Sequence, residues 1–339
     1  DICRQVKKLW TDDKEKIEKS SVSIAAQLDR AFAFAAADEP DASLLDQTYQ
    51  KIKPGFDPRH GGFDPAPKFP SPHRLLFLLR CYHRSEDANA LEMVTKTLTA
   101  MRLGGIWDHV GFGFHRYSTD ARLLLPHFEK MLNGNALLAR LYFDAWRASG
   151  DPGDLEVGRA TLDYVLRELS GDGGPFYASQ DADSEGVEGR YYVWTPEQVK
   201  AVLGESDGTL FCEFYDVRPG GNWDEGGAAS ILHAPRPPAE FARAKGLEAD
   251  ELERRLREMR WLMLEARRRR PPPQTDDKII TGWNGLMISA MAHGTQVTGD
   301  GWQMPGPMAL ALAESFSERS RLFPRETKKI GDRWELEGE

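Results

Sequence analysis

The chain has 339 residues, of which 40% are hydrophobic and 29% charged, a balance typical of a folded globular protein rather than a disordered one. Its 44 basic and 53 acidic residues give a formal net charge of −9, which argues against a general nucleic-acid binder because such proteins carry basic surfaces. Three widely separated cysteines, Cys3, Cys81 and Cys212, form no CxxC pair, which argues against a disulfide framework or a dithiol redox centre within these residues.

The N-terminal third predicts helices separated by one long loop. Residues 12–37 favour a helix that DEPDAS ends, and a second helix is expected from Ser43. The run PGFDPRHGGFDPAPKFPSP (54–72) is too rich in glycine and proline for a helix or strand, so it predicts a long ordered loop. Ser71 is expected to cap a helix with Pro72 at its first position, and another helix covers 88–103.

In the middle of the chain the spacing of apolar residues changes once from a helical to a strand-like pattern. Apolar residues at spacings of three and four predict a helix from Pro126 to about Gly150, followed by one over 154–168. FYASQDADSEGVEGRYYVW (176–194) predicts a short β-hairpin with an acidic turn. TPEQ at 195–198 is a capping box, and Gly204 is placed to end that helix.

The remainder is again helical. A charged helix is expected over 240–268, ending in RRRRPPPQ, where the arginines are interpreted as a solvated helix end. Further helices are predicted from Thr281 and near 307–321. With no run of 18 apolar residues and no signal peptide, the chain predicts no membrane span and, by default, a cytoplasmic all-α protein made of antiparallel helix pairs.

Four phrases resemble consecutive signatures of one family: KFPSPHRLLFLLR, GGIWDHVGFGFHRYSTDARLLLPHFEKML, FYASQDADSEGVEGRYYVWTPEQV and DDKIITGWNGLMISAMA. They span residues 68–292 and are similar to the thioredoxin-domain-containing proteins of the spermatogenesis-associated protein 20 and bacterial YyaL type. The resemblance implies an (α/α)6 toroid related to N-acylglucosamine 2-epimerases and six-hairpin glycosidases, preceded by a thioredoxin-like domain.

Two departures from that family pattern shape the expected domains. The cysteine motif of the thioredoxin-like domain is absent, so residues 1–38 are interpreted as the tail of that domain and a linker helix. Residues 39–339 are then a partial toroid, because six hairpins need twelve helices and the resemblance fades after about Gly299.

The first candidate site lies in GFGFHRYSTDARLLLPHFEKML (111–132), which holds His115, His127 and Glu129. Imidazole titrates near neutral pH, so the two histidines are candidates for general acid and base, with Glu129 as a further candidate catalytic residue. Because a helix turns about 100° per residue, a helix starting at Pro126 points His127 and Glu129 to nearly opposite sides. The alternative is that these side chains pair with free amides or cations at the helix start.

The acidic turn is the second candidate site. Its spacing matches the first half of a calcium loop, but Tyr192 stands where a bidentate glutamate is required, so an EF-hand is rejected. Asp181 and Asp183, two apart on an extended segment, are expected to face one side as the paired carboxylates that glycoside hydrolysis uses. The alternative is a solvated hairpin tip. Neither a metal site nor a cofactor is predicted.

The third candidate site is DDKIITGWNG, where Asp277, Trp283 and Asn284 suit sugar binding because a ring can stack and polar groups can fix orientation. Equally, Thr281 is a candidate helix cap and Trp283 a candidate core residue. Further rim residues are expected in neighbouring loops: Trp107, Asp108, His109, Arg116, Tyr117, and in the long loop His60, Asp64, Lys68 and Phe69.

These residues support a carbohydrate-active enzyme with epimerase-like proton transfer, with glycoside hydrolysis as an alternative. A different alternative is a non-catalytic scaffold that binds a ligand or partner and positions a redox thioredoxin-like domain. The expected partner is a small carbohydrate rather than nucleic acid. Convergence of His115, His127, Asp181 and Asp277 within one pocket would favour the enzyme hypotheses, and scatter would favour the helix-end alternative.

Overall fold

The computed structural model describes residues 2–32, 43–171, 174–223, 227–299, 327–330 and 333–336. Contacts divide the chain into two compact units, residues 1–50 and 51–339. The predicted domain boundary after residue 38 falls among residues 33–42, outside the described residues, and so stays a prediction. The helix predicted near 307–321 also lies outside them.

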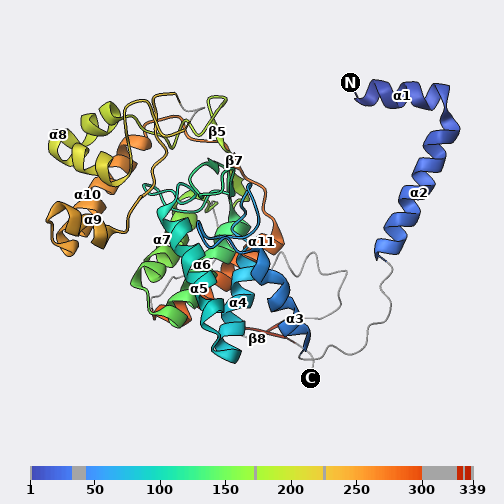
Figure 1. Ribbon diagram of the computed structural model, residues 1–339, viewed down its shortest axis with the longest axis horizontal. Helices are drawn as coiled ribbons and strands as arrows, with labels where there is room; N and C mark the ends of the chain where they lie inside the picture. Colours follow the sequence, from blue (N-terminus) through green and yellow to red (C-terminus); the bar gives the residue numbers. More distant parts are fainter. Residues whose placement is uncertain are drawn as a thin grey trace. The chain divides into compact units, whose positions relative to one another are not determined.

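The first unit is helical (Figure 1). Helix α1 covers Ile2–Asp12, and α2 covers Lys14–Phe32, within the predicted helix 12–37. Helix α3, Ser43–Ile52, begins at the predicted residue and ends just past the unit boundary.

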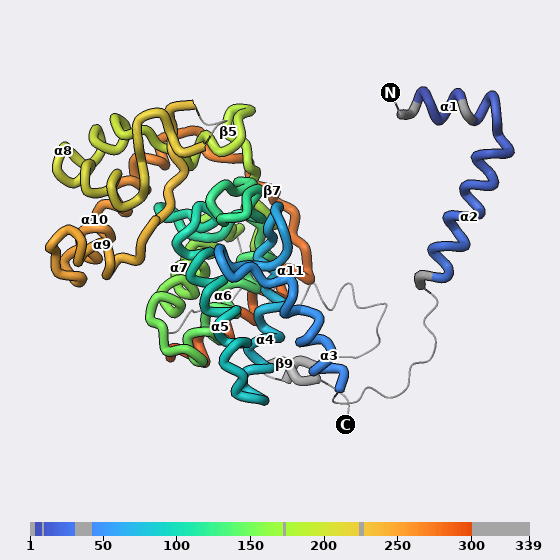
Figure 2. Tube along the Cα trace, in the orientation of Figure 1, coloured from blue at the N-terminus to red at the C-terminus, as the bar shows by residue number. Residues whose placement is uncertain are grey.

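The second unit is built from helices that pack in pairs (Figures 1 and 2). Its helices are α4 (Pro72–Ser85), α5 (Ala88–Leu103), α6 (Leu132–Ser149), α7 (Pro152–Glu168), α8 (Pro196–Phe214), α9 (Pro238–Lys245), α10 (Ala249–Arg267) and α11 (Thr281–Thr298). Helix α4 packs against α5, α6 against α7, and α6 also contacts α4 and α11. The predicted all-α class with helical hairpins is confirmed. No helix in the described parts of the chain is both long and apolar enough to cross a membrane.

Helix α6 lies at the centre of this packing because its apolar residues recur every three or four positions. Leu132, Ala136, Ala139 and Phe143 are buried against Leu162 of α7 and Met287 of α11, among others. The Phe143 ring lies so close to Gly158 and Gly294 that a Cβ atom on either would approach it to 2.9 or 2.8 Å. These two glycines therefore let three helices approach one aromatic ring.

The first turns of α6 and α11 share one polar feature. Asn135 Oδ1 accepts a hydrogen bond from Phe114 N at 2.7 Å, and its Nδ2 donates to Phe114 O and Met131 O. Asn284 does the same with Phe176 N at 2.8 Å, Phe176 O and Ile280 O. Because both amides are buried and saturated by backbone groups, they fix two loops to two helix starts.

Short strands lie in the loops between the helices: β1 (Tyr117–Ser118), β2 (Pro126–His127), β3 (Lys130–Met131), β4 (Ser179–Gln180), β5 (Asp183–Ser184), β6 (Val187–Glu188) and β7 (Thr275–Asp276). Two further strands, β8 (Thr327–Ile330) and β9 (Arg333–Leu336), follow α11 in the chain. All pairings are antiparallel: β1 with β2, β8 with β9, β5 with β6, and β4 with both β3 and β7. The β5–β6 pair is the predicted hairpin.

Several predicted boundaries are corrected. The helix predicted from Pro126 begins only at Leu132, because residues 126–131 are extended and pair with β1 and β4. The helix predicted over 240–268 is two helices separated at Gly246, which has a φ of 66°. The prediction for Gly204 is confirmed: its backbone is non-helical, with φ 77° and ψ 174°, so the helical segment that starts at the capping box ends there and a second segment of α8 follows.

Two helix starts also differ from expectation. Ser71 precedes α4 as predicted, but its φ is 45° and its side chain makes no capping hydrogen bond. The cap position of α11 is Ile280, so Thr281 is the first helical residue rather than the cap.

Candidate functional site

Three segments far apart in sequence meet in the three-stranded sheet β3–β4–β7. Its register places Lys130 opposite Gln180, and Ser179 opposite Asp276. Since side chains alternate along extended chain, Glu129 and Lys130 leave β3 in different directions. Lys130 is buried, at 1% exposure, whereas the side chain of Glu129 is 21% exposed.

A polar cleft of about 460 Å³ lies at this sheet. We call it the acidic cleft, and its lining residues are Glu129, Ser179, Asp181, Gln274, Thr275, Asp276, Asp277 and Lys278. Four carboxylates thus face one ammonium, which Asp276 holds at 2.9 Å. The cleft brings together three of the sequence-predicted residues, namely Glu129, Asp181 and Asp277, from three separate segments.

His127 lies beside the acidic cleft between two glutamates. Its Nδ1 is 2.7 Å from Glu188 Oε1, and its Nε2 is 3.7 Å from Glu129 Oε2. A carboxylate only accepts hydrogen bonds, so Nδ1 donates to Glu188, and Nε2 is the ring nitrogen that faces Glu129. The expectation that His127 and Glu129 point to opposite sides is therefore wrong, since that segment is extended and residues two apart share a side.

Two further predicted residues support this histidine. Arg116 Nη1 is 2.8 Å from Glu129 Oε2, which holds that carboxylate beside His127. The centre of the Tyr117 ring lies 5.1 Å from that of the His127 ring, and the centre of the Phe69 ring lies 4.8 Å from that of the Tyr117 ring. The imidazole is therefore oriented by both charge and ring packing, while 26% of its side chain is exposed.

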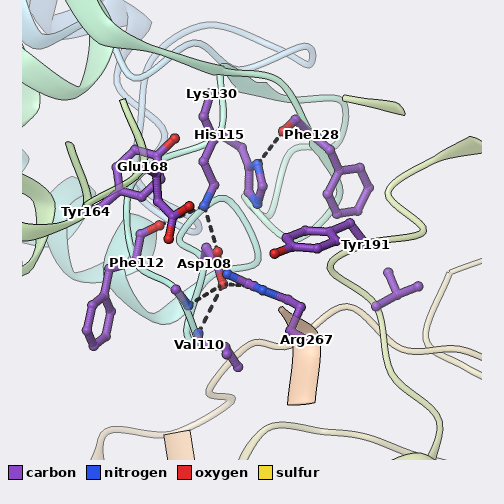
Figure 3. A network of polar contacts seen from close by, with 12 residues as sticks. Asp108, Val110, Phe112, His115, Phe128, Lys130, Tyr164, Glu168, Tyr191 and Arg267 are labelled. Atoms are coloured by element: carbon purple, nitrogen blue, oxygen red, sulfur yellow. Dashed lines mark hydrogen bonds and ion pairs between the residues drawn. The ribbon is translucent and has the colours of Figure 1, made fainter. Parts of the chain in front are cut away.

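A buried ion network lies behind β3 (Figure 3). Asp108 accepts from Lys130 Nζ at 2.6 Å and from Arg267 Nη1 at 2.8 Å, and it also accepts from the backbone amides of Val110 and Gly111. Lys130 also donates to Phe112 O at 2.7 Å. We call Asp108, Lys130 and Arg267 the buried ion network; each side chain is 5% exposed or less.

Aromatic rings surround the two cations of this network. Lys130 Nζ is 4.5 Å from the centre of the Tyr164 ring and 5.0 Å from that of Tyr192. The Arg267 guanidinium lies 5.0 Å from the Tyr191 ring and 5.2 Å from the Tyr192 ring. Ring faces attract cations and exclude water, so the network is held in a dry environment.

Burial sets the ionisation of this region. Despite burial, which opposes ionisation, the pKa of Asp108 is well below its usual value because of Arg267 and Lys130. Burial lowers the pKa of Lys130 to about 8 and that of His115 to about 3. His115 Nδ1 lies 2.7 Å from Phe128 O and donates to it, so His115 is a neutral, buried ring outside the lining of the acidic cleft.

The other predicted residues lie away from this cleft. His109 is buried with Nε2 3.0 Å from Gly104 O, and burial lowers its pKa to about 4. Trp107 is buried 4.6 Å from the Phe114 ring. Trp283 of α11 is partly buried against the core formed with α6 and α7, and the Asn284 amide is saturated by backbone hydrogen bonds. Asp183 is exposed on β5, separated from Asp181 by the break between β4 and β5.

In the long loop, two predicted residues form ion pairs that stabilise the loop itself. The buried Lys68 Nζ donates to Asp57 Oδ2 at 2.5 Å and to Gly61 O at 2.8 Å. Asp64 pairs with Arg74 at the surface, and His60 donates its backbone amide to Asp57 Oδ1.

Sequence reasoning missed Lys130, Glu188 and Arg267. The interpretation of the RRRR run as solvated is wrong for Arg267, which is 4% exposed, and for Arg270, whose guanidinium lies 3.6 Å from the Trp194 ring. A signal was present, because Arg267 continues the buried series Leu252, Leu256, Met259 and Met263 of α10 at helical spacing. Across the residues that the structure describes, no three His, Cys, Asp or Glu side chains are grouped as metal ligands.

No family model matches the chain. Spermatogenesis-associated protein 20 of Homo sapiens is 35% identical over 322 residues, covering 86% of this chain and 41% of that protein. The Rattus norvegicus protein of the same name is 35% identical and is likewise covered to 41%. The chain therefore spans about two fifths of the length of the curated relatives it matches.

Solved structures with a distant likeness include a sugar epimerase from a ruminal bacterium, at 11% identity and a TM-score of 0.36, covering 86% of this chain and 90% of that one. Cellobiose 2-epimerase from Spirochaeta thermophila is 15% identical with a TM-score of 0.37, covering 83% and 73%. A family 76 glycoside hydrolase from Bacteroides thetaiotaomicron is 11% identical with a TM-score of 0.38, covering 76% and 64%. These scores are too low to assign an activity.

Proposed function

This chain is a homologue of spermatogenesis-associated protein 20, and we propose that its second unit is a carbohydrate-active domain with acid/base chemistry at His127. The observation that carries the proposal is the position of His127. Glu188 fixes one ring nitrogen at 2.7 Å, while the other lies 3.7 Å from Glu129 at the edge of the acidic cleft. A base within reach of a bound ligand and oriented by a carboxylate is what general acid/base catalysis requires.

The acidic cleft suits a polyol. Carboxylates only accept hydrogen bonds, so Glu129, Asp181 and Asp277 can receive several sugar hydroxyls at once. A volume of about 460 Å³ is within the range of small-ligand sites. The lining is polar rather than apolar, which favours a hydroxylated ligand over a lipid or an aromatic one.

The reaction we propose is epimerase-like proton transfer at the carbon beside the carbonyl of an open-chain sugar. His127 Nε2 takes the proton from that carbon, and the electron pair of the broken C–H bond passes to the carbonyl oxygen to give an enediolate. Asp181, which reaches the cleft from a different segment, delivers a proton in its acid form to the opposite face of the same carbon, where a new C–H bond forms as the enediolate returns to the carbonyl. Proton exchange with water then resets His127 and Asp181. His115 leaves the proposed catalytic pair because it is buried and bonded to Phe128 O.

The test is proton exchange in D2O with a panel of reducing mono- and disaccharides, followed by NMR of the carbon-bound hydrogen. We expect deuterium at carbon 2 together with inversion at that carbon. His127→Asn should abolish the exchange, and Asp181→Asn should abolish inversion. His83→Asn, an exposed histidine on α4, is the matched control and should leave both unchanged. Full exchange in the His127→Asn variant contradicts the proposed role of this residue.

Glycoside hydrolysis is the second candidate, favoured by the carboxylates of the acidic cleft. The originally predicted pair is revised to Asp181 with Glu129, because Asp183 does not line the cleft. Release of reducing ends from a glycan panel, lost in Asp181→Asn, would select hydrolysis over epimerisation. Absence of sugar binding across both panels would instead favour the scaffold alternative.

A further inference from the structure

A second cleft, of about 410 Å³, lies on the other side of His127. We call it the aromatic cleft, and its lining residues are Ser184, Glu185, Val187, Glu188, Arg190, Tyr191, Val193, Gln198, Trp223, Ala229, Arg270 and Pro271. None of them lines the acidic cleft. The proposed function uses one of them, Glu188, and only as a support for His127.

His127 connects the two clefts. Its Nδ1 is 2.7 Å from Glu188, which lines the aromatic cleft, and its Nε2 is 3.7 Å from Glu129, which lines the acidic cleft. Only one imidazole ring therefore separates a carboxylate of one cleft from a carboxylate of the other. The two clefts are therefore neighbours across this ring.

The walls of the aromatic cleft are held by contacts within the protein. Arg270 Nη1 donates to Tyr191 O at 3.0 Å and to Val193 O at 2.8 Å, and Ser184 Oγ donates to Pro271 O at 2.7 Å. The segment at residues 270–271 is thereby joined to both ends of the β5–β6 hairpin region. A cleft fixed in this way does not have to be assembled by its ligand, which lowers the entropic cost of binding.

The chemistry of the two clefts differs. The acidic cleft offers carboxylates, a serine, a threonine and an amide, whereas the aromatic cleft adds the rings of Tyr191 and Trp223 to Glu185, Arg190 and Gln198. Arg190 and Glu185 lie 3.4 Å apart and balance each other's charge. An aromatic surface beside a few polar groups suits a sugar ring, because its C–H face packs on the aromatic ring while its hydroxyls bond to the edges.

We infer that the two clefts form one binding site for a saccharide of at least two units, with the reacting unit in the acidic cleft and its neighbour in the aromatic cleft. This inference rests on the proposed function. It deepens that function by naming the substrate class: an oligosaccharide or disaccharide with a free reducing end rather than a free monosaccharide.

The experiment compares a monosaccharide, its disaccharide and its trisaccharide, titrated calorimetrically into the full chain and into three variants. Tyr191→Ala removes a ring from the aromatic cleft, Tyr191→Phe keeps the ring, and Asp277→Asn alters the acidic cleft. We expect the disaccharide to bind at least tenfold more tightly than the monosaccharide. Tyr191→Ala should remove that gain, Tyr191→Phe should keep it, and Asp277→Asn should weaken both sugars.

The outcomes separate this inference from the proposed function. If the monosaccharide binds and exchanges its carbon-2 proton as well as the disaccharide does, and Tyr191→Ala changes neither, the two-cleft inference is overturned while the proposed function stands. If no saccharide of any length binds, both are overturned. Retention of the chain-length gain in Tyr191→Ala also overturns the inference, provided near-UV circular dichroism shows the variant to be folded.

Discussion

Replacement of Asp108 by asparagine is expected to destabilise the second unit by about 3–5 kcal/mol, the range measured when one partner of a buried ion pair is removed. The carboxylate of Asp108 is 4% exposed and accepts from Lys130 at 2.6 Å and from Arg267 at 2.8 Å. Asparagine leaves these two cations without a counter-charge and can point an amide donor at one of them. Urea unfolding followed by near-UV circular dichroism measures the loss as a lower transition midpoint at an unchanged slope.

The control for this prediction is Asp64→Asn, which removes an ion pair of similar length from the surface. Asp64 lies 2.5 Å from Arg74, but their side chains are 55% and 36% exposed, so we expect a change of about 0–1 kcal/mol. The double variant Asp108→Asn, Lys130→Met should recover part of the loss, because it removes one of the unpaired cations. Equal midpoint shifts for Asp108→Asn and Asp64→Asn would refute the role of burial.

Three further predictions concern pH and packing. Burial raises the pKa of Asp154 to about 7, so the folded chain keeps a proton that the unfolded chain loses above about pH 4, and stability falls as the pH rises from 4 to 7. Asp154→Asn should flatten this slope and stabilise the protein at pH 8 by up to about 4 kcal/mol. A variant with the same dependence of stability on pH as the parent chain would contradict this role of Asp154. Burial lowers the pKa of His115 to about 3, so the contribution of His115 to stability is complete above about pH 6.5 and is lost as the pH falls from there towards 3. His115→Gln should remove about 1.4 kcal/mol per pH unit of this dependence. Urea titrations at pH 4 to 7 measure the difference between the variant and the parent chain. Gly294→Ala places a methyl group 2.8 Å from Phe143 and should cost about 1–3 kcal/mol; a thermal midpoint equal to that of the parent chain would contradict the close packing.

Much of the helical fold could be predicted because its signals are local. Helix α5 matches the predicted range, and the capping box predicted at residues 195–198 has both of its hydrogen bonds, from Gln198 N to Thr195 Oγ1 and from Thr195 N to Gln198 Oε1. The predicted helix start at Pro126 is wrong for the opposite reason. The segment is extended because it pairs with residues near 118 and 180, and neither pairing leaves a periodic trace in the segment itself.

The candidate site shows the same division. Glu129, Asp181 and Asp277 were identified as polar residues in loops, and the structure brings them into one cleft. Their companions could not be separated from structural polar residues by sequence. Asn284 is saturated by Phe176, which is 108 positions away, and His115 is neutral because its burial is set by distant rings such as Tyr192.

The buried ion network has a consequence for local unfolding of the segments that it joins. Its three side chains come from the loop before β1, from β3 and from the last residue of α10. Because movement of one segment would leave a buried charge without its partner in another, the three segments are expected to unfold together. Their amide hydrogens are therefore expected to exchange with solvent together, with a single opening free energy, as one cooperative unit rather than as three independently fraying loops.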